Sequence, residues 1–342
     1  MFPALIDKLV RRHDLTVEEA AAAMTGIMDG HATPAQMAAL LVGLAMKGER
    51  PAEIVGFART MRERAVKLPK AHPDAVDLCG TGGDRSGTFN ISSVAAIVTA
   101  ACGVKVAKHG NRSVSSRSGS ADVFEALGVR TLLSPEAVDR SLDEEGIAFL
   151  FAPAFHPSMK HAAAVRRELG VRTAFNLLGP LTNPARPARQ LVGVPRPELT
   201  ELIARALLLL GCERAWVVHG ADGIDEISTT GYTKISECWQ GTVRTFYVHP
   251  SEFGVAKASA AAIRGADAGH NASVARAILA GERGPARDIV LFNAGAALFV
   301  AGRAATVRDG LDRAAEAIDA GDAARTLQRM AELSNQAGMI AS

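Results

Sequence analysis

Cysteine is scarce in this sequence: only four occur among 342 residues, and they lie far apart. No Cys-x-x-Cys pair occurs and no histidine has a zinc-like spacing, which argues against a zinc site or a disulfide framework. Long apolar runs are also missing, since none reaches the roughly 18 residues of a membrane-spanning helix. The first residues, Met1-Phe2-Pro3, do not begin a basic and then apolar leader. We therefore expect a soluble cytoplasmic protein with reduced thiols.

An excess of charge of either sign is absent as well. The 38 Lys and Arg residues nearly balance the 36 Asp and Glu residues, which leaves a formal net charge of +2. Bulk charge therefore implies no face for nucleic acid. No internal repeat is visible, and 342 residues suffice for one large or two modest domains.

A glycine-rich run, Gly80-Thr81-Gly82-Gly83-Asp84, follows a short extended segment and precedes a helical pattern. Glycine permits positive φ and close approach, so several backbone N–H groups could point at one anion. We expect Ser92 or Ser93 to cap the next helix beside that anion. The spacings of the phosphate loop and of Gly-x-Gly-x-x-Gly are absent, which weakens an ATP or NAD interpretation. A plain strand-to-helix turn is the alternative.

A second run, Lys108-His109-Gly110-Asn111-Arg112, follows the strand-like segment 104–107. Ligands collect at the carboxyl ends of strands in open parallel sheets, so the two runs could converge on one phosphate-bearing ligand. His109 could be a structural hydrogen-bonding group or a proton donor. The acidic pair Asp225-Glu226 follows the expected strand 215–219 and offers the oxygen ligands that Mg²⁺ prefers. A solvated loop is the alternative for this pair.

Hydrophobic periodicity divides the chain into a helical part and an α/β part. Helices alone are expected over residues 4–12, 16–29, 34–47 and 51–66, with starts at Thr16, Thr33 and Pro51. Segment 67–73 then reads as a linker. Strands are expected near residues 75, 104 and 147 and over 190–194, 215–219, 233–239 and 242–248. Further helices are expected from 92, 121 and 135 and over 157–169, 197–210, 271–280, 285–301, 306–320 and 322–335. This alternation predicts the α/β class.

Several motifs, in a fixed order, carry a family resemblance. They are Asp77–Asp84, Asn90-Ile91-Ser92, Lys108–Arg112, Gly119–Asp122, His156–Met159, Val165–Gly170, Phe175–Pro184, His219-Gly220 and Asp225-Glu226. Over nearly its whole length the chain resembles the anthranilate phosphoribosyltransferases. The resemblance implies a small all-helical domain of residues 1–69 with about 160–188. It also implies a large α/β domain of residues 70–159 and 189–342 with a mostly parallel sheet, and a homodimer formed through the helical domain.

The implied reaction transfers the 5-phosphoribosyl group from 5-phosphoribosyl-1-pyrophosphate to the amine of anthranilate, in L-tryptophan biosynthesis. The aromatic amine is neutral and carries its lone pair, so the barrier lies in the departure of pyrophosphate. Mg²⁺ and fixed N–H donors stabilise that departing charge, and no covalent intermediate is expected. Lys108, Asp225 and Glu226 are expected to act electrostatically.

The matching motifs also imply the substrate-binding residues. For the phosphoribosyl donor these are Gly80, Gly83, Asp84, Thr88, Asn90, Ile91, Ser92, Ser93, Lys108, His109, Gly110, Asn111, Arg112, Ser113, Val114, Ser115, Ser116 and Ser120. For anthranilate they are Gly80, Asn111, His156, Arg166 and Gly179, and for two Mg²⁺ ions they are Ser92, Asp225 and Glu226. Arg166 suits a carboxylate because its planar guanidinium forms two parallel bonds. The alternatives are Arg167, about 100° away on the helix, and a plain surface charge for Arg166.

Segment Ser113–Ser120 has five serines and one glycine in eight residues, which suits neither a helix nor a strand. Our hypothesis is a lid that folds over the donor and excludes water. A loop without that role is the alternative.

One stretch departs from the family pattern, and two other functions remain open. Where the family usually has Gly-Gly-Asp-Ala, this chain reads Arg264-Gly265-Ala266-Asp267, outside the substrate motifs. A pyrimidine-nucleoside phosphorylase-like enzyme shares the architecture but carries a Lys-His-Ser-Thr-Gly-Gly-type loop. A non-catalytic nucleic-acid-binding paralogue should be basic and should lose the anthranilate residues, yet Asn111 and Arg166 remain. We therefore expect small-molecule substrates, with neither nucleic acid nor membrane as partner.

Overall fold

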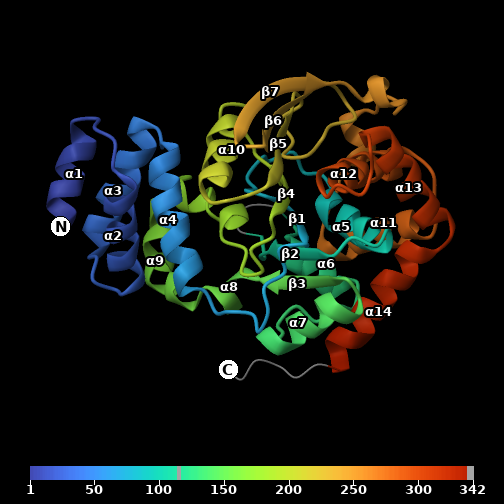
Figure 1. Cartoon of the computed structure of the whole chain (residues 1–342), viewed down its shortest axis with the longest axis horizontal. Helices are drawn as coiled ribbons and strands as arrows, with labels where there is room; N and C mark the ends of the chain where they lie inside the picture. The colour runs from blue at the N-terminus through green and yellow to red at the C-terminus, as the bar shows by residue number, and fades with distance from the viewer. Residues whose placement is uncertain (114–116, 337–342) are drawn as a thin grey trace.

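A helical bundle lies at one end of the molecule and a larger α/β body at the other (Figure 1). The computed structural model describes residues 1–113 and 117–336. The bundle contains α1 (Phe2–Val10), α2 (Val17–Met28), α3 (Pro34–Lys47), α4 (Pro51–Arg64) and, later in the chain, α9 (Lys160–Leu169). Helix α2 packs against α4, α1 against α3, and α9 against α2 and α3. The prediction that the N-terminal part is purely helical is confirmed.

Local sequence determines where these helices begin. The hydroxyl of Thr16 accepts a hydrogen bond from the backbone N–H of Glu19, whose side chain accepts one from the Thr16 N–H in return. Thr33 caps α3 in the same way. This reciprocal capping satisfies N–H groups that have no partner within the helix. Pro51 begins α4, where its missing N–H costs nothing. The three predicted starts are confirmed.

One seven-stranded sheet forms the centre of the α/β body, in the order β3-β2-β1-β4-β5-β6-β7. Its strands are β1 (Val76–Gly80), β2 (Val106–Gly110), β3 (Ile147–Phe151), β4 (Arg189–Gly193), β5 (Arg214–Gly220), β6 (Thr233–Trp239) and β7 (Thr242–Val248). Strands β1 to β5 are parallel to one another, whereas β6 pairs antiparallel with both β5 and β7. The predicted α/β class with a mostly parallel sheet is confirmed. The carboxyl ends of the parallel strands share one edge, where ligands collect in such sheets.

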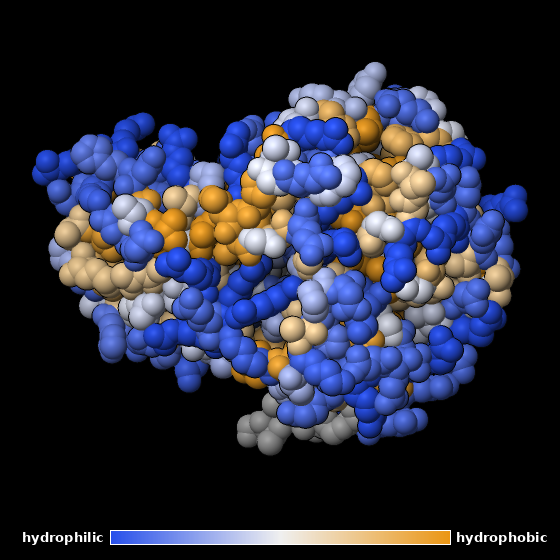
Figure 2. Space-filling model, in the orientation of Figure 1, coloured by the Kyte–Doolittle hydropathy of each residue, from blue (hydrophilic) through white to orange (hydrophobic). Residues whose placement is uncertain are grey.

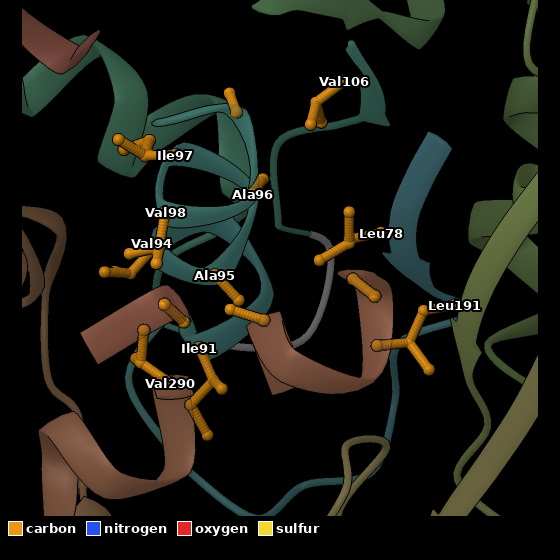
Figure 3. Packing of buried hydrophobic residues seen from close by; sticks show 14 of the residues in the cluster. Leu78, Ile91, Val94, Ala95, Ala96, Ile97, Val98, Val106, Leu191 and Val290 are labelled. Carbon is orange, nitrogen blue, oxygen red and sulfur yellow. The ribbon is translucent and has the colours of Figure 1, made fainter. Parts of the chain in front are cut away.

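Both faces of this sheet are buried, because neighbouring residues of a strand enter different apolar clusters. Leu191 of β4 faces α5 (Ile91–Ala101) and α12 (Pro285–Val300), whereas Val192 faces the bundle and α10 (Leu199–Leu209). Figure 3 shows Leu78, Leu191 and Val290 pointing into the apolar cluster between the sheet, α5 and α12. The remaining helices are α6 (Ser120–Ala126), α7 (Pro135–Glu144), α8 (Ala152–Phe155), α11 (Ala268–Leu279), α13 (Val307–Asp319) and α14 (Asp322–Gln336).

Helix α10 joins the bundle to the sheet. It packs against α4 on one side and against β5 and β6 on the other. Buried residues of α2, α3, α4, α9 and α10 form one apolar cluster with the second face of β4 and β5. The core of the bundle is therefore continuous with part of the core of the α/β body.

Three local predictions were wrong or incomplete. Helix α5 begins at Ile91 with Asn90 at its N-cap, so neither Ser92 nor Ser93 caps it. Strand β2 continues to Gly110 rather than ending at residue 107, because buried polar residues extend it. The four-residue α8 was not predicted, and neither were the short 3-10 helices Ala174–Asn176, Gly179–Leu181, Pro250–Phe253 and Ala260–Ile263. The predicted helix 157–169 begins with a 3-10 turn, Pro157–Met159, before α9. No helix within the described residues is long and apolar enough to span a bilayer.

Candidate active site

The glycine-rich run and the acidic pair meet beyond the carboxyl ends of β1, β4 and β5. Gly80 ends β1 beside Gly193 of β4, and the Thr81 N–H donates to the Gly193 carbonyl at 2.9 Å. The carbonyl oxygen of Asp225 lies 1.6 Å from the place where a Cβ on Gly193 would stand. Only glycine at position 193 lets the acidic loop approach the strand ends this closely.

The glycine loop contacts the acidic pair directly. Gly82 and Gly83 have φ angles of +63° and +81°, a backbone conformation that glycine adopts without strain. The Gly82 N–H donates to Asp225 Oδ2 at 3.1 Å. A Cβ on Gly80 would stand 2.5 Å from the same oxygen. Two motifs that lie far apart in the sequence therefore form one site.

Burial, together with crowding of acidic groups, raises the pKa values of Asp225 and Glu226. Burial, and then repulsion from Asp84, raises the pKa of Asp225 to about 7. Burial, and then repulsion from Asp225, raises the pKa of Glu226 to about 8. Glu226 Oε1 also accepts from the Ser92 N–H at 3.1 Å. A cation between these carboxylates would favour their ionised forms.

The carboxylate oxygens of Asp225 and Glu226 are suitable ligands for Mg²⁺. Within residues 1–113 and 117–336, no group of three or more His, Cys, Asp or Glu is arranged for a metal ion. The chain instead presents two adjacent carboxylates, Asp225 and Glu226, and the Ser92 backbone N–H donates to Glu226. Mg²⁺ commonly takes one or two protein carboxylates and fills its other positions with water and substrate phosphate.

Lys108 brings a buried positive charge beneath the glycine loop. The residue is 2 % exposed, and its Nζ donates to the Leu78 carbonyl and lies 3.4 Å from Ser92 Oγ. A buried ammonium needs negative partners, and attraction from Lys108 opposes the raised pKa values of Asp77 and Glu226. Lys108 therefore adds positive potential from inside the sheet.

Other predicted donor-binding residues surround this centre. Asn90 Oδ1 accepts from Ser118 Oγ and from Asn271 Nδ2, and Ser86 Oγ contacts both Asp84 and Thr88. Ile91 and Ser93 are each 1 % exposed, so neither presents its side chain to a ligand in this structure.

The second predicted loop is partly engaged with α6. Arg112 forms ion pairs with Asp122 at 2.9 Å and Glu125 at 2.7 Å, so its guanidinium is already engaged. The Asn111 N–H donates to Ser120 Oγ at 3.3 Å, and the Ser113 N–H donates to Asp122. Val114, Ser115 and Ser116, the centre of the hypothetical lid, lie outside the described residues.

The residues predicted for anthranilate gather around two buried imidazoles. His109 Nδ1 donates to the Gly179 carbonyl at 3.0 Å, and its ring meets that of His156 edge-on, with centroids 5.5 Å apart. Burial lowers the pKa of His109 to about 3 and that of His156 to about 4, so both rings are neutral. His109 therefore acts as a structural hydrogen-bond donor through Nδ1. Gly179 is exposed, with open space where a Cβ would stand.

Helix α9 orients its two adjacent arginines differently. Arg166 is half-buried, with its guanidinium 5.5 Å from the centre of the Phe175 ring, and burial lowers the pKa of Arg166. Arg167 is exposed. Of the two candidates, Arg166 is the one that faces the protein interior.

Asp77, its partner Asn183, and Arg172 belong to this site but were not assigned roles from the sequence. The Asp77 carboxylate, buried in β1, accepts from Asn183 Nδ2 and from the His109 N–H, and burial raises the pKa of Asp77 to about 6. Arg172 lies over the glycine loop, and burial lowers the pKa of Arg172. An acidic residue within an apolar strand was a usable signal for Asp77. Nothing local distinguished Arg172 from a surface arginine.

Comparison with known families places this site in a class of enzymes. Residues 3–65 match the family described as "Glycosyl transferase family, helical bundle domain". Residues 72–324 match "Glycosyl transferase family, a/b domain". The chain is thus a two-part enzyme of the glycosyl transferase class.

Curated relatives and solved structures narrow this class. The chain is 56% identical to the anthranilate phosphoribosyltransferase of Moorella thermoacetica, over 96% of this chain and 97% of that protein. It is 54% identical to the enzyme of that name from Symbiobacterium thermophilum, over 97% and 98% of the two chains. The chain therefore belongs to the anthranilate phosphoribosyltransferase family and is an enzyme of that kind. The nucleoside phosphorylase and nucleic-acid-binding alternatives are not favoured.

Two solved structures resemble the chain throughout. The anthranilate phosphoribosyltransferase of Thermus thermophilus superposes with a TM-score of 0.92 at 44% identity, covering 97% of this chain and 99% of that one. The Saccharomyces cerevisiae enzyme, in complex with PRPP and Mg, superposes with a TM-score of 0.90 at 26% identity, covering 98% of each chain. The yeast enzyme has also been solved with 4-fluoroanthranilate.

Proposed function

We propose that this chain transfers the 5-phosphoribosyl group from 5-phosphoribosyl-1-pyrophosphate to the amine of anthranilate. The products are N-(5-phosphoribosyl)anthranilate and pyrophosphate, and the step belongs to L-tryptophan biosynthesis in the cytoplasm. The observation that carries this proposal is the hydrogen bond from the Gly82 N–H to Asp225, which joins an anion-binding loop to a carboxylate pair. The yeast relative solved with PRPP and Mg supports the same pair of ligands here.

Donor binding combines backbone N–H groups with buried charge. Gly80, Gly83, Asp84, Thr88 and Asn90 to Ser93 surround the diphosphate and ribose, and Lys108 to Ser116 with Ser120 complete the site. Ser92, Asp225 and Glu226 would hold Mg²⁺, with two ions for each chain. When bound, Mg²⁺ offsets the negative charge of the departing pyrophosphate. Lys108 adds to that stabilisation from beneath the loop, and no covalent intermediate is required.

Anthranilate binds on the side of the site nearest α9. Arg166 binds its carboxylate through two parallel hydrogen bonds, and no carboxylate of the described residues forms an ion pair with Arg166. Asn111, Gly80, Gly179 and His156 position the ring. The neutral imidazoles keep cationic charge away from an amine that attacks a cation-like carbon.

The helical part is proposed to be a domain and a dimer interface. Residues 1–69 with about 160–188 form this small domain, and residues 70–159 and 189–342 form the donor-binding domain. Met1, Val10 and Met46 are 58%, 75% and 74% exposed on the bundle. Apolar side chains gather over the bundle on the face seen in Figure 2. A second copy would cover them, so sedimentation should give about twice the chain mass of 35.8 kDa.

The loss of anthranilate fluorescence on addition of Mg²⁺ and the phosphoribosyl donor tests the proposed function. Arg166→Ala should raise the KM for anthranilate about 10- to 100-fold with little change for the donor. Asp225→Asn should lower kcat about 10²- to 10³-fold. Arg167→Ala is the matched control and should behave as wild type. An Arg166→Ala effect confined to the donor would contradict the assignment, and a wild-type protein without turnover would contradict the function.

A further inference from the structure

Arg172 is a cation at the donor site that the predicted binding motifs do not include. It follows the end of α9, where Gly170 turns the chain with φ +60°. Its Nη2 donates to the Thr81 carbonyl at 3.4 Å. Its Nη1 lies 1.5 Å from the place where a Cβ on Gly83 would stand. The guanidinium therefore occupies the space left by the missing side chain of the glycine loop.

Arg172 forms no ion pair with an Asp or Glu of the described residues, although Asp225 and Asp84 are near enough to attract its charge. Its hydrogen bond is to a backbone carbonyl, which leaves four of the five guanidinium N–H groups for other acceptors. By contrast, Arg112 is already paired with Asp122 and Glu125.

The position of Arg172 indicates that it would contact the diphosphate end of the phosphoribosyl donor. The loop that it covers donates through Gly82 to Asp225, which belongs to the proposed magnesium pair. A metal-bound diphosphate must lie against that pair. Lys108 approaches from inside the sheet, whereas Arg172 approaches from the segment after α9. The two cations thus reach the loop from different elements.

We propose that Arg172 is a further substrate-binding residue, whose guanidinium binds the diphosphate of the phosphoribosyl donor. This inference rests on the proposed function. One short segment then addresses both substrates, with Arg166 for the anthranilate carboxylate and Arg172 for the leaving group. Arginine suits this role because its planar fork matches phosphate oxygens and stays charged.

Calorimetric titration with Mg²⁺ and inorganic pyrophosphate tests the role of Arg172, with steady-state kinetics alongside. Arg172→Gln should weaken pyrophosphate binding about 10- to 100-fold and raise the KM for the donor by a similar factor. The KM for anthranilate should stay within about twofold, and Arg166→Gln should show the opposite pattern. Arg167→Gln, which removes a nearby exposed charge, should match wild type.

Pyrophosphate binding and donor KM at wild-type values in Arg172→Gln would overturn the inference and leave the proposed function intact. A wild-type protein that binds no donor and gives no turnover would instead overturn the proposed function. If Arg172→Gln does not fold by circular dichroism, Arg172→Lys takes its place. Its single ammonium should bind pyrophosphate several-fold more weakly, and wild-type affinity there would also overturn the inference.

Discussion

The side-chain amide of Asn183 donates to the buried carboxylate of Asp77 at 2.8 Å, although the two residues are 106 positions apart. The same amide donates to the Ala107 carbonyl, and the other Asp77 oxygen accepts from the His109 N–H. These bonds fix the segment that carries Gly179 to β1 and β2. The placement of the proposed anthranilate site thus depends on a polar contact in the core.

Replacing Asn183 with leucine should destabilise the protein by about 2 to 3 kcal/mol, because it leaves the buried Oδ2 of Asp77 with only the weak S–H donor of Cys79. Urea unfolding measures this difference. Asn335→Leu, which removes an exposed amide bond to the Gly128 carbonyl, is the control and should change stability by less than about 0.5 kcal/mol. Equal effects in both variants would contradict a special role for the Asp77 contact.

Gly193→Ala should disturb the acidic pair without touching a proposed ligand. Its Cβ would stand 1.6 Å from the Asp225 carbonyl oxygen, so the loop must move. We expect kcat/KM for the donor to fall at least about tenfold, since small displacements of binding groups are costly. Gly231→Ala is the control, because its Cβ would meet no atom within 4 Å. Saturation of activity with Mg²⁺ should also need a higher concentration in Gly193→Ala alone.

Burial of His156 should make the fold sensitive to acid. Its pKa is lowered from 6.5 to about 4 in the folded protein, so the unfolded chain takes up the proton first as the pH falls. This contribution is present above pH 6.5 and is lost as the pH falls towards 4, up to about 3 kcal/mol. Between pH 6.5 and 4, the free energy of unfolding should fall less in His156→Phe than in wild type. Urea unfolding at several pH values measures this difference. The exposed His13→Phe should follow wild type.

Magnesium should stabilise the fold through the acidic pair only when the donor diphosphate is present. A ligand that binds only the folded state raises the melting temperature, and the rise grows with the logarithm of the ratio of ligand concentration to Kd. We expect a clear rise for wild type with Mg²⁺ and donor, and a reversal with a chelator. Glu226→Gln should lose most of this rise, whereas the exposed Glu316→Gln should keep it. A rise in melting temperature in Glu226→Gln equal to that of wild type would show that Glu226 is not a metal ligand.

Local patterns predicted the regular elements well. The hairpin of β6 and β7 has the predicted bounds, and Thr16 and Thr33 cap as expected, since capping and alternation act over a few residues. The predicted N-cap of α5 was wrong because Ser118 and Asn271, from distant segments, hold Asn90 at that position. Helix α8 is only four residues long, too short for a periodic signal.

The motifs named the main residues of the candidate site but not their contacts. The family pattern gave Asp225 and the glycine run, whereas the Gly82 bond between them depends on strand order. Arg172 was missed because its proposed role depends on its guanidinium lying where a side chain of Gly83 would be. No sequence pattern reveals that contact.

The apolar cluster shared by the bundle, α10 and the sheet has a consequence for biosynthesis. Residues Phe2 to Met61 bury their side chains partly against residues 199–217. A nascent chain must therefore emerge from the ribosome for more than half its length before those early helices find all their partners. Until then their apolar side chains are exposed and can bind chaperones or associate with other chains. Slow translation between α4 and α10 should therefore lower the yield of folded enzyme.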